Sequence, residues 1–150
     1  MFRELSLLPV YTSDNNDIPK EFYNPVLLSA ETFDRTSAYF SAKALSKYAE
    51  GLENYCARKK KYRLVISHDI SEEDFNEIKE GYDLKTAITD ELLERLDDDL
   101  SLREEKSISN LAYFIAKGTV DIKIAFKTVG IFHDKCGIAT DSEGESICFR

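Results

Sequence analysis

The sequence has no tryptophan, one methionine, three prolines and three cysteines among its 150 residues. Cys56, Cys136 and Cys148 are odd in number and widely spaced, which argues against a disulfide framework and predicts reduced, mostly buried thiols. The chain has only two histidines, His68 and His133, and neither lies at a zinc-ligand spacing from a cysteine. The sequence therefore predicts neither a disulfide-stapled fold nor a structural metal.

Long apolar runs are also absent. No run is long enough to span a bilayer, and the apolar stretch at the N-terminus is too short for a secretory signal. These absences predict a cytoplasmic protein with no membrane partner. Hydrophobic residues make up 43% of the chain and charged residues 32%, as in globular proteins, and the length suits a single domain over 1–150.

The chain lacks an excess of cations, since its formal net charge is −8. That balance argues against a simple nucleic-acid-binding surface. About half of the acidic residues lie in the segment 69–105, which is typical of solvated helix faces, and a metal site there is the less favoured interpretation. The strongest basic cluster is 58–63, which indicates either contacts to phosphates or, more simply, a helix end followed by a turn.

Hydrophobic periodicity and capping residues predict alternating helices and strands. Ser41 and Ser71 are typical helix N-caps, Gly81 and Gly118 are typical helix terminators, and a second acidic helix is expected near Asp90. The expected helices cover 17–30, 41–57, 71–81 and 104–117, and the expected strands cover 33–40, 62–67, 120–126, 135–140 and 146–149.

This order predicts an α/β fold with a mixed, largely parallel sheet and helices on both faces. The strand, helix and strand over 33–67 suit a right-handed βαβ unit, and the last two strands flank the turn 141–144 as a β-hairpin. The chain stops directly after a strand, at Arg150, which predicts a truncated domain, an N-terminal fragment of a longer protein.

The chemistry-bearing feature is the sequence Phe132-His133-Asp134-Lys135. Side chains alternate along a strand, so His133 and Lys135 point the same way. An imidazole is a nucleophile and an acid or base near neutral pH, and an ammonium neutralises the oxygens of a phosphate. One strand face thus combines two groups that phosphodiester cleavage requires.

The segment 132–149 resembles the phospholipase-D-like nuclease domains. It is most similar to the variant found at the N-terminus of bacterial DEAD/DEAH-box helicases and in some restriction endonucleases. The segments 36–41 and 71–81 resemble further parts of that variant, and the similarity covers most of 18–150.

The resemblance implies that His133 is the nucleophile forming a phosphohistidine, that Lys135 binds the phosphate and that Asp141 helps to organise the site. It also implies a metal-independent reaction with no cofactor. In the family four residues usually separate the lysine from the aspartate, which would place the acid at Thr140, whereas five residues intervene here. The second His-x-Lys that the family uses is missing, because Ile70 stands where a lysine would follow His68.

These features leave three interpretations. The first is a phosphodiesterase module, a nuclease acting on nucleic acid such as DNA, belonging to a helicase- or restriction-associated protein. A homodimer or another half-domain would then supply the second histidine. The second is a non-catalytic module of the same fold that binds nucleic acid or protein. The third is an unrelated α/β domain with a chance His-x-Lys.

Two aromatic residues after the first predicted strand, Tyr39 and Phe40, could stack on a nucleobase, although packing in the core is the favoured interpretation. His68 follows the second predicted strand, where sites of α/β proteins gather, and is expected to be a loop histidine facing solvent or hydrogen-bonded.

Overall fold

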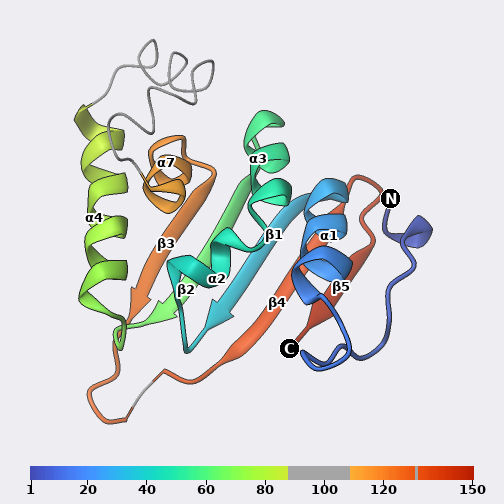
Figure 1. The fold of residues 1–150 in the computed structure, drawn as a ribbon, viewed down its shortest axis with the longest axis horizontal. Coiled ribbons are helices and arrows are strands. Elements are labelled where there is room, and N and C mark those ends of the chain that lie inside the picture. The colour runs from blue at the N-terminus through green and yellow to red at the C-terminus, as the bar shows by residue number, and fades with distance from the viewer. Residues whose placement is uncertain (88–108, 131) are drawn as a thin grey trace.

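The computed structural model describes residues 1–87, 109–130 and 132–150, which form a five-stranded sheet with helices packed against it (Figure 1). The strands are β1 (Ala30–Ser37), β2 (Lys61–Ser67), β3 (Val120–Ala125), β4 (Lys135–Asp141) and β5 (Ser146–Phe149). The helical elements are η1 (Phe2–Glu4), η2 (Pro19–Tyr23), α1 (Asn24–Ser29), α2 (Ala42–Ser46), α3 (Ala49–Ala57), α4 (Glu72–Ala87) and α7 (Asn110–Ala116).

The sheet has the strand order β3-β2-β1-β4-β5. The pairs β1–β2 and β2–β3 are parallel, whereas β1–β4 and β4–β5 are antiparallel. The α/β class and the mixed sheet are thus confirmed, although parallel pairing does not predominate. The predicted βαβ unit is formed by β1, the helices α2 and α3, and β2, and the predicted hairpin is formed by β4 and β5.

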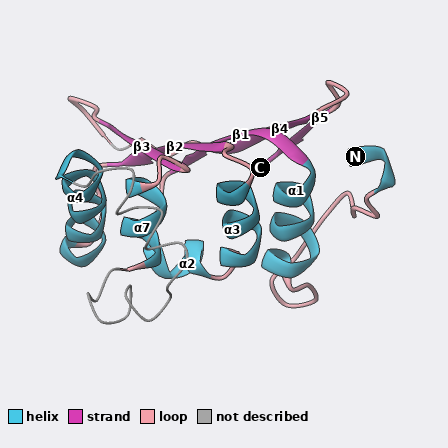
Figure 2. Cartoon of the chain, turned by 90° about the horizontal axis from the view of Figure 1, so that it is seen from above, coloured by secondary structure: helices cyan, strands magenta, loops and turns pink. Residues whose placement is uncertain are grey.

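The expectation of helices on both faces is wrong for the part of the chain that is described. Figure 2 shows α1, α2, α3, α4 and α7 all on the same face of the sheet. The crossovers from β1 to β2 and from β2 to β3 step in the same direction, so right-handed connections place their helices on the same side. The described residues between β3 and β4, 126–130 and 132–134, include no helix that could cover the other face.

The core lies between the sheet and these helices. Phe33 on β1 is fully buried and stacks on Tyr62 of β2, with ring centroids 4.8 Å apart. The helices contribute buried aliphatic and aromatic side chains to the same cluster, including Val26, Leu27, Leu45, Leu52, Tyr55, Leu111, Phe114 and Ile115. Burial of this apolar face supplies the main driving force for the fold.

Local capping chemistry was predicted correctly at several helix ends. The Ser41 hydroxyl accepts the amide N–H of Ala44 at 3.0 Å, and the Ser71 hydroxyl accepts that of Asp74 at 3.0 Å. Gly118 has φ +76° after α7, in the left-handed conformation that glycine adopts most easily. The sequence after Ser41 forms two short helices, α2 and α3, where one continuous helix was expected.

Gly81 does not terminate a helix as expected, since α4 continues to Ala87. A Cβ at this position would lie 2.7 Å from the Cβ of Ile115 and 3.0 Å from the Cα of Ala112. Glycine therefore allows α4 and α7 to approach closely, and this tertiary requirement outweighs its low helix propensity. The first strand also begins and ends three residues earlier than expected, at 30–37.

The cysteines and the expected acidic helix can also be compared with the structure. The three cysteines are free, as expected, but Cys136 and Cys148 are exposed and Cys56 is half-buried, so the prediction of mostly buried thiols is wrong. The reason is that Cys136 alternates along β4 with the buried Gly137 and Ala139, and Cys148 pairs with the exposed Ile138, so both thiols lie on the sheet face away from the core. The acidic helix expected near Asp90, and residues 104–108 of the helix expected over 104–117, lie outside the described residues.

Candidate functional site

The candidate site lies where the carboxyl end of β1 meets the start of β4. Antiparallel pairing sets Ser37, the last residue of β1, opposite Lys135, the first residue of β4. The residues that follow β1 therefore lie beside those that precede β4, and Tyr39 comes next to His133. In a sheet with parallel strands, the carboxyl ends are where ligands usually bind.

Three side chains converge at this edge. The Nζ atom of Lys135 lies 3.3 Å from Nε2 and 3.4 Å from Nδ1 of His133. The Tyr39 hydroxyl lies 3.3 Å from the same Nε2, and the ammonium of Lys135 lies 5.0 Å from the centroid of the Tyr39 ring. The structure thus brings the predicted pair His133 and Lys135 together and adds the Tyr39 phenol, which the sequence suggested only as a ring that packs in the core or stacks on a nucleobase.

The local backbone explains the position of Tyr39. The Ser37 hydroxyl donates to the Tyr39 carbonyl at 3.1 Å, which fixes the chain as it leaves β1. The Tyr39 ring is 64% exposed, so the favoured expectation that it packs in the core is wrong, whereas Phe40 does pack against the core. Its ring meets the His133 ring edge-on, with centroids 5.5 Å apart.

The contacts with Tyr39 and Lys135 orient the His133 imidazole, which is exposed to solvent. When the Tyr39 phenol donates its hydrogen bond to Nε2, that nitrogen carries the lone pair of the His133 ring and Nδ1 carries the proton. His133 and Lys135 are both exposed, so a phosphate could reach them from solvent. Once the Tyr39 hydroxyl releases its hydrogen bond to Nε2, the lone pair of this imidazole can attack, or accept a proton near, an anionic phosphorus centre beside the Lys135 ammonium.

Asp141 is not part of this cluster. It is the last residue of β4, about 20 Å from Lys135 at the strand rise of roughly 3.4 Å per residue. Its carboxylate accepts amide N–H groups from Phe2 at 2.9 Å and from Glu143 and Glu145 at 3.0 Å each. Asp141 thus closes the β4–β5 turn and anchors the N-terminus, and we do not include it in the proposed site.

The hydrogen bonds of Asp141 predict a pH-dependent stability. The amide of Phe2, above all, holds the pKa of this carboxyl below its ordinary value of 3.8. A lowered folded-state pKa adds stability above the unfolded pKa, and this stability is lost as pH falls through the folded pKa. Asp141→Asn should therefore lower the Tm at pH 7, and the difference from the native chain should shrink near pH 3.

Thermal unfolding followed by circular dichroism at the two pH values measures this effect. Asp14→Asn is a matched control, because Asp14 lies exposed in the loop before η2 and should leave the Tm unchanged at both. An Asp141→Asn difference of the same size at both pH values would show that the charge of Asp141 is not the cause.

The second histidine lies at the same edge of the sheet but not in the cluster. His68 follows β2, is exposed as expected and stacks on the exposed Phe126 after β3, with ring centroids 5.5 Å apart and an interplanar angle of 13°. In the sheet order, β1 lies between β2 and β4, and two strand spacings amount to about 10 Å. His68 is therefore a nearby histidine outside the hydrogen-bonded group.

The basic cluster 58–63 serves mainly the fold. Arg58 donates to the carbonyls of Leu27 at 2.5 Å and Ala30 at 3.1 Å, where α1 ends and β1 begins. Lys60 pairs with Glu31, and Arg63 pairs with Asp34 through two hydrogen bonds. The interpretation as a helix end and turn is supported, since three of its cations already have protein partners.

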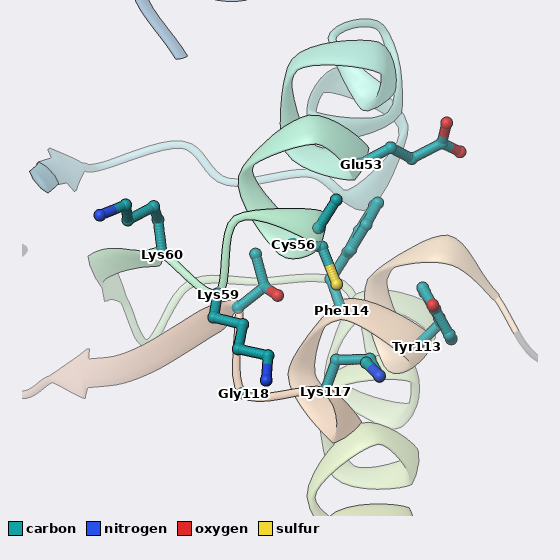
Figure 3. Close-up of a pocket in the computed structure, with 10 residues that line it drawn as sticks. Glu53, Cys56, Lys59, Lys60, Tyr113, Phe114, Lys117 and Gly118 are labelled. Carbon is teal, nitrogen blue, oxygen red and sulfur yellow. The ribbon is translucent and has the colours of Figure 1, made fainter. Parts of the chain in front are cut away.

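A cavity of about 650 Å³ lies near this cluster, at the amino ends of β2 and β3. It is lined by residues from α3 and α7 and from the turns that follow them, among them Cys56, Lys59, Phe114 and Lys117. In Figure 3 the side chains of Glu53 and Lys60 extend to opposite sides, away from Cys56. No histidine or aspartate is among its described lining residues, and we assign no chemistry to it.

Metal-ligating clusters and membrane-spanning helices are absent from the part of the chain that the structure describes. Among 1–87, 109–130 and 132–150, no three histidine, cysteine, aspartate or glutamate side chains are placed to share a metal ion. Within those ranges, no helix combines the length and apolar character needed to cross a membrane. The chain matches no family model, no curated protein and no solved structure.

Proposed function

We propose that the chain is a phosphodiesterase module, a nuclease that acts on DNA through a phosphohistidine intermediate. The observation that carries this proposal is the contact of about 3.3 Å between Lys135 Nζ and the His133 ring at the open edge of the sheet. The resemblance of 132–149 to phospholipase-D-like nuclease domains supports the same chemistry. It also supports a place beside a helicase domain, or in a restriction system, in a longer protein.

The first step would be an in-line attack. The lone pair of a His133 nitrogen forms a bond to phosphorus, and the bond from phosphorus to the leaving oxygen breaks with its electron pair. The leaving oxygen takes a proton from an acid. Lys135 neutralises the negative charge that builds on the non-bridging oxygens. Water then attacks the phosphohistidine, a base takes its proton, and a phosphate monoester leaves with the imidazole restored.

The acid and base would come from a second copy of the chain. Within the described residues, the cluster contains a single imidazole, that of His133, while a two-step reaction needs a proton donor opposite the nucleophile. Twofold symmetry would place two His133 side chains across the same phosphate, one attacking and one donating the proton. A homodimer is therefore part of the proposal.

Hydrolysis in the presence of EDTA tests the proposal. The native chain should release p-nitrophenol from bis(p-nitrophenyl) phosphate and should cleave DNA without a divalent metal. Its specific activity should rise with protein concentration until all of the protein is dimeric. Sedimentation at the same concentrations measures the fraction of dimer. No turnover at concentrations where the dimer is complete would overturn the catalytic proposal.

A non-catalytic module that binds nucleic acid or protein is the alternative. The single imidazole of the cluster and the net charge of −8 favour it. DNA binding that weakens with salt but is unaffected by His133→Ala would support this alternative. A chance His-x-Lys on an unrelated domain is less favoured, because the two side chains converge at an open edge and are not buried in the core.

A further inference from the structure

A second cavity adjoins the His133 cluster on the helix side of the sheet. Its volume is about 710 Å³, and it lies between the ends of β4 and β5, helix η2 and the N-terminal segment 7–11. We call it the Arg35 cavity. Its charged lining residues are Arg35, Lys135 and Arg150, and no acidic residue is among the described residues that line it. In a chain with a net charge of −8, such a purely cationic lining favours an anionic ligand.

Arg35 differs from three other arginines of the described chain. Arg3, Arg58 and Arg63 each pair with a carboxylate. In the described residues no carboxylate forms an ion pair with Arg35. A partly buried guanidinium without a counter-ion is costly, because it remains charged at any pH that the protein meets.

Aromatic groups hold Arg35 in place. Its Cζ lies 5.1 Å from the centroid of the Tyr23 ring, and its Nη1 donates to the Tyr48 hydroxyl at 3.4 Å. The Tyr48 hydroxyl is in turn 3.2 Å from that of Tyr62. These neutral contacts engage Nη1 and fix the position of the guanidinium without neutralising its charge, so its other N–H groups can still donate to an oxyanion.

Arg35 and Lys135 also share one face of the β1–β4 pair. Arg35 is opposite Gly137, and Ser37 is opposite Lys135, so the two cations are diagonal neighbours, at a typical separation of about 7–8 Å. Lys135 therefore belongs to both places, because it contacts His133 and lines the Arg35 cavity. A phosphate held at Lys135 can extend its substituent into the cavity.

The remaining lining is apolar and aromatic. Tyr11, Phe22, Tyr23 and Phe149 line the cavity, together with aliphatic side chains of the segment 7–11. Unstacked nucleobases bind to proteins by stacking on aromatic side chains, next to cations that contact the phosphate. The lining thus combines both elements of a nucleotide site.

We propose that the Arg35 cavity binds the nucleotide on one side of the scissile phosphate, with Arg35 on a phosphate oxygen and the base against the aromatic lining. The proposal rests on the proposed nuclease function and specifies its substrate as a single-stranded end or an unpaired nucleotide, because a paired base cannot enter a cavity. Arg35 is a binding residue of this site.

Calorimetric titration with thymidine 5′-monophosphate and with inorganic phosphate tests the proposal, using a His133→Ala chain so that binding is measured apart from turnover. The nucleotide should bind more tightly than inorganic phosphate. Arg35→Met should weaken nucleotide binding about 10-fold or more, as expected for the loss of a charged hydrogen bond. Arg63→Met is the matched control and should have no effect, since Arg63 is 64% exposed and pairs with Asp34.

A second variant keeps the test valid should Arg35→Met fail to fold. Tyr11 lies in the N-terminal segment outside the sheet, and Tyr11→Ala should weaken binding of the nucleotide but not of inorganic phosphate. Equal affinity for the two probes in the native cavity, or unchanged binding in both variants, would overturn the proposal. So would binding to phosphatidic acid vesicles without binding to the nucleotide.

The outcome is separable from that of the proposed function. If nucleotide binding depends on Arg35 but the native chain shows no turnover, the Arg35 cavity remains a nucleotide site and the proposed phosphodiesterase activity is refuted. If the native chain shows turnover but Arg35→Met leaves nucleotide binding unchanged, the phosphodiesterase activity is supported and the Arg35 cavity is not the nucleotide site.

Discussion

His133→Ala is expected to lower kcat/KM for bis(p-nitrophenyl) phosphate by at least about 1000-fold, because removal of a covalent nucleophile leaves only positioning and electrostatic effects. Lys135 would remain, and so would the open edge of the sheet. The loss should therefore fall on the chemical step and leave binding of the phosphodiester nearly unchanged. The measurement is the steady-state rate in EDTA at a protein concentration where the dimer is complete.

The matched control is His68→Ala. This residue is the other histidine of the chain, is exposed at the same sheet edge and stacks on Phe126, but lies outside the hydrogen-bonded cluster. Its removal should leave the rate within about threefold of the native value. A labelled diester should also give an alkali-stable phosphoprotein with the native chain and none with His133→Ala. Turnover that survives His133→Ala would rule out the proposed nucleophile.

Phe33→Ala is expected to lower the free energy of unfolding by roughly 3–5 kcal/mol, the usual cost of emptying a buried phenylalanine site. Phe33 is 0% exposed and lies on β1, the central strand of the sheet. Its ring lies 4.8 Å from that of Tyr62, 5.5 Å from that of Phe149 and 6.3 Å from that of Tyr23. Such rings cannot all collapse into the space, so a cavity would remain.

Urea denaturation at low temperature measures the loss as a shift of the midpoint at constant slope. Phe126→Ala is the matched control: it removes the same atoms from a ring that is 79% exposed, and should change the free energy of unfolding by less than about 0.5 kcal/mol. A loss below about 1 kcal/mol for Phe33→Ala would contradict the described core.

The elements that could be predicted are those decided by a few neighbouring residues. Ser41, Ser71 and Gly118 act at helix ends through bonds or backbone angles within their own turn, so sequence alone identified them. The β4–β5 hairpin follows equally from its turn, where Gly144 has φ +81°. The closeness of His133 and Lys135 was also predicted, although His133 lies in the loop before β4 and not on a strand face.

The failures have a common cause in contacts between distant segments. Glycine is typical of a helix end, which is why α4 was expected to stop at Gly81. Instead α7 packs against Gly81 and α4 continues past it. Tyr39 is an aromatic residue and was expected in the core. However, β1 ends at Ser37, before Tyr39, so the ring is exposed and lies beside His133. Asp141 was expected at the site, yet it binds the amide of Phe2, a residue 139 positions away.

The sequence by itself determined the α/β class, most of the caps and turns, and the closeness of His133 to Lys135, which stand two residues apart in the chain. These depend on periodicity and on hydrogen bonds within one turn or strand. Only the tertiary structure decided that the described helices cover one face, that Tyr39 joins the His133 cluster, and that Arg35 and Lys135 line one cavity. Those results depend on strand order and register, which arise from the burial of apolar surface across the whole chain and not from any local pattern.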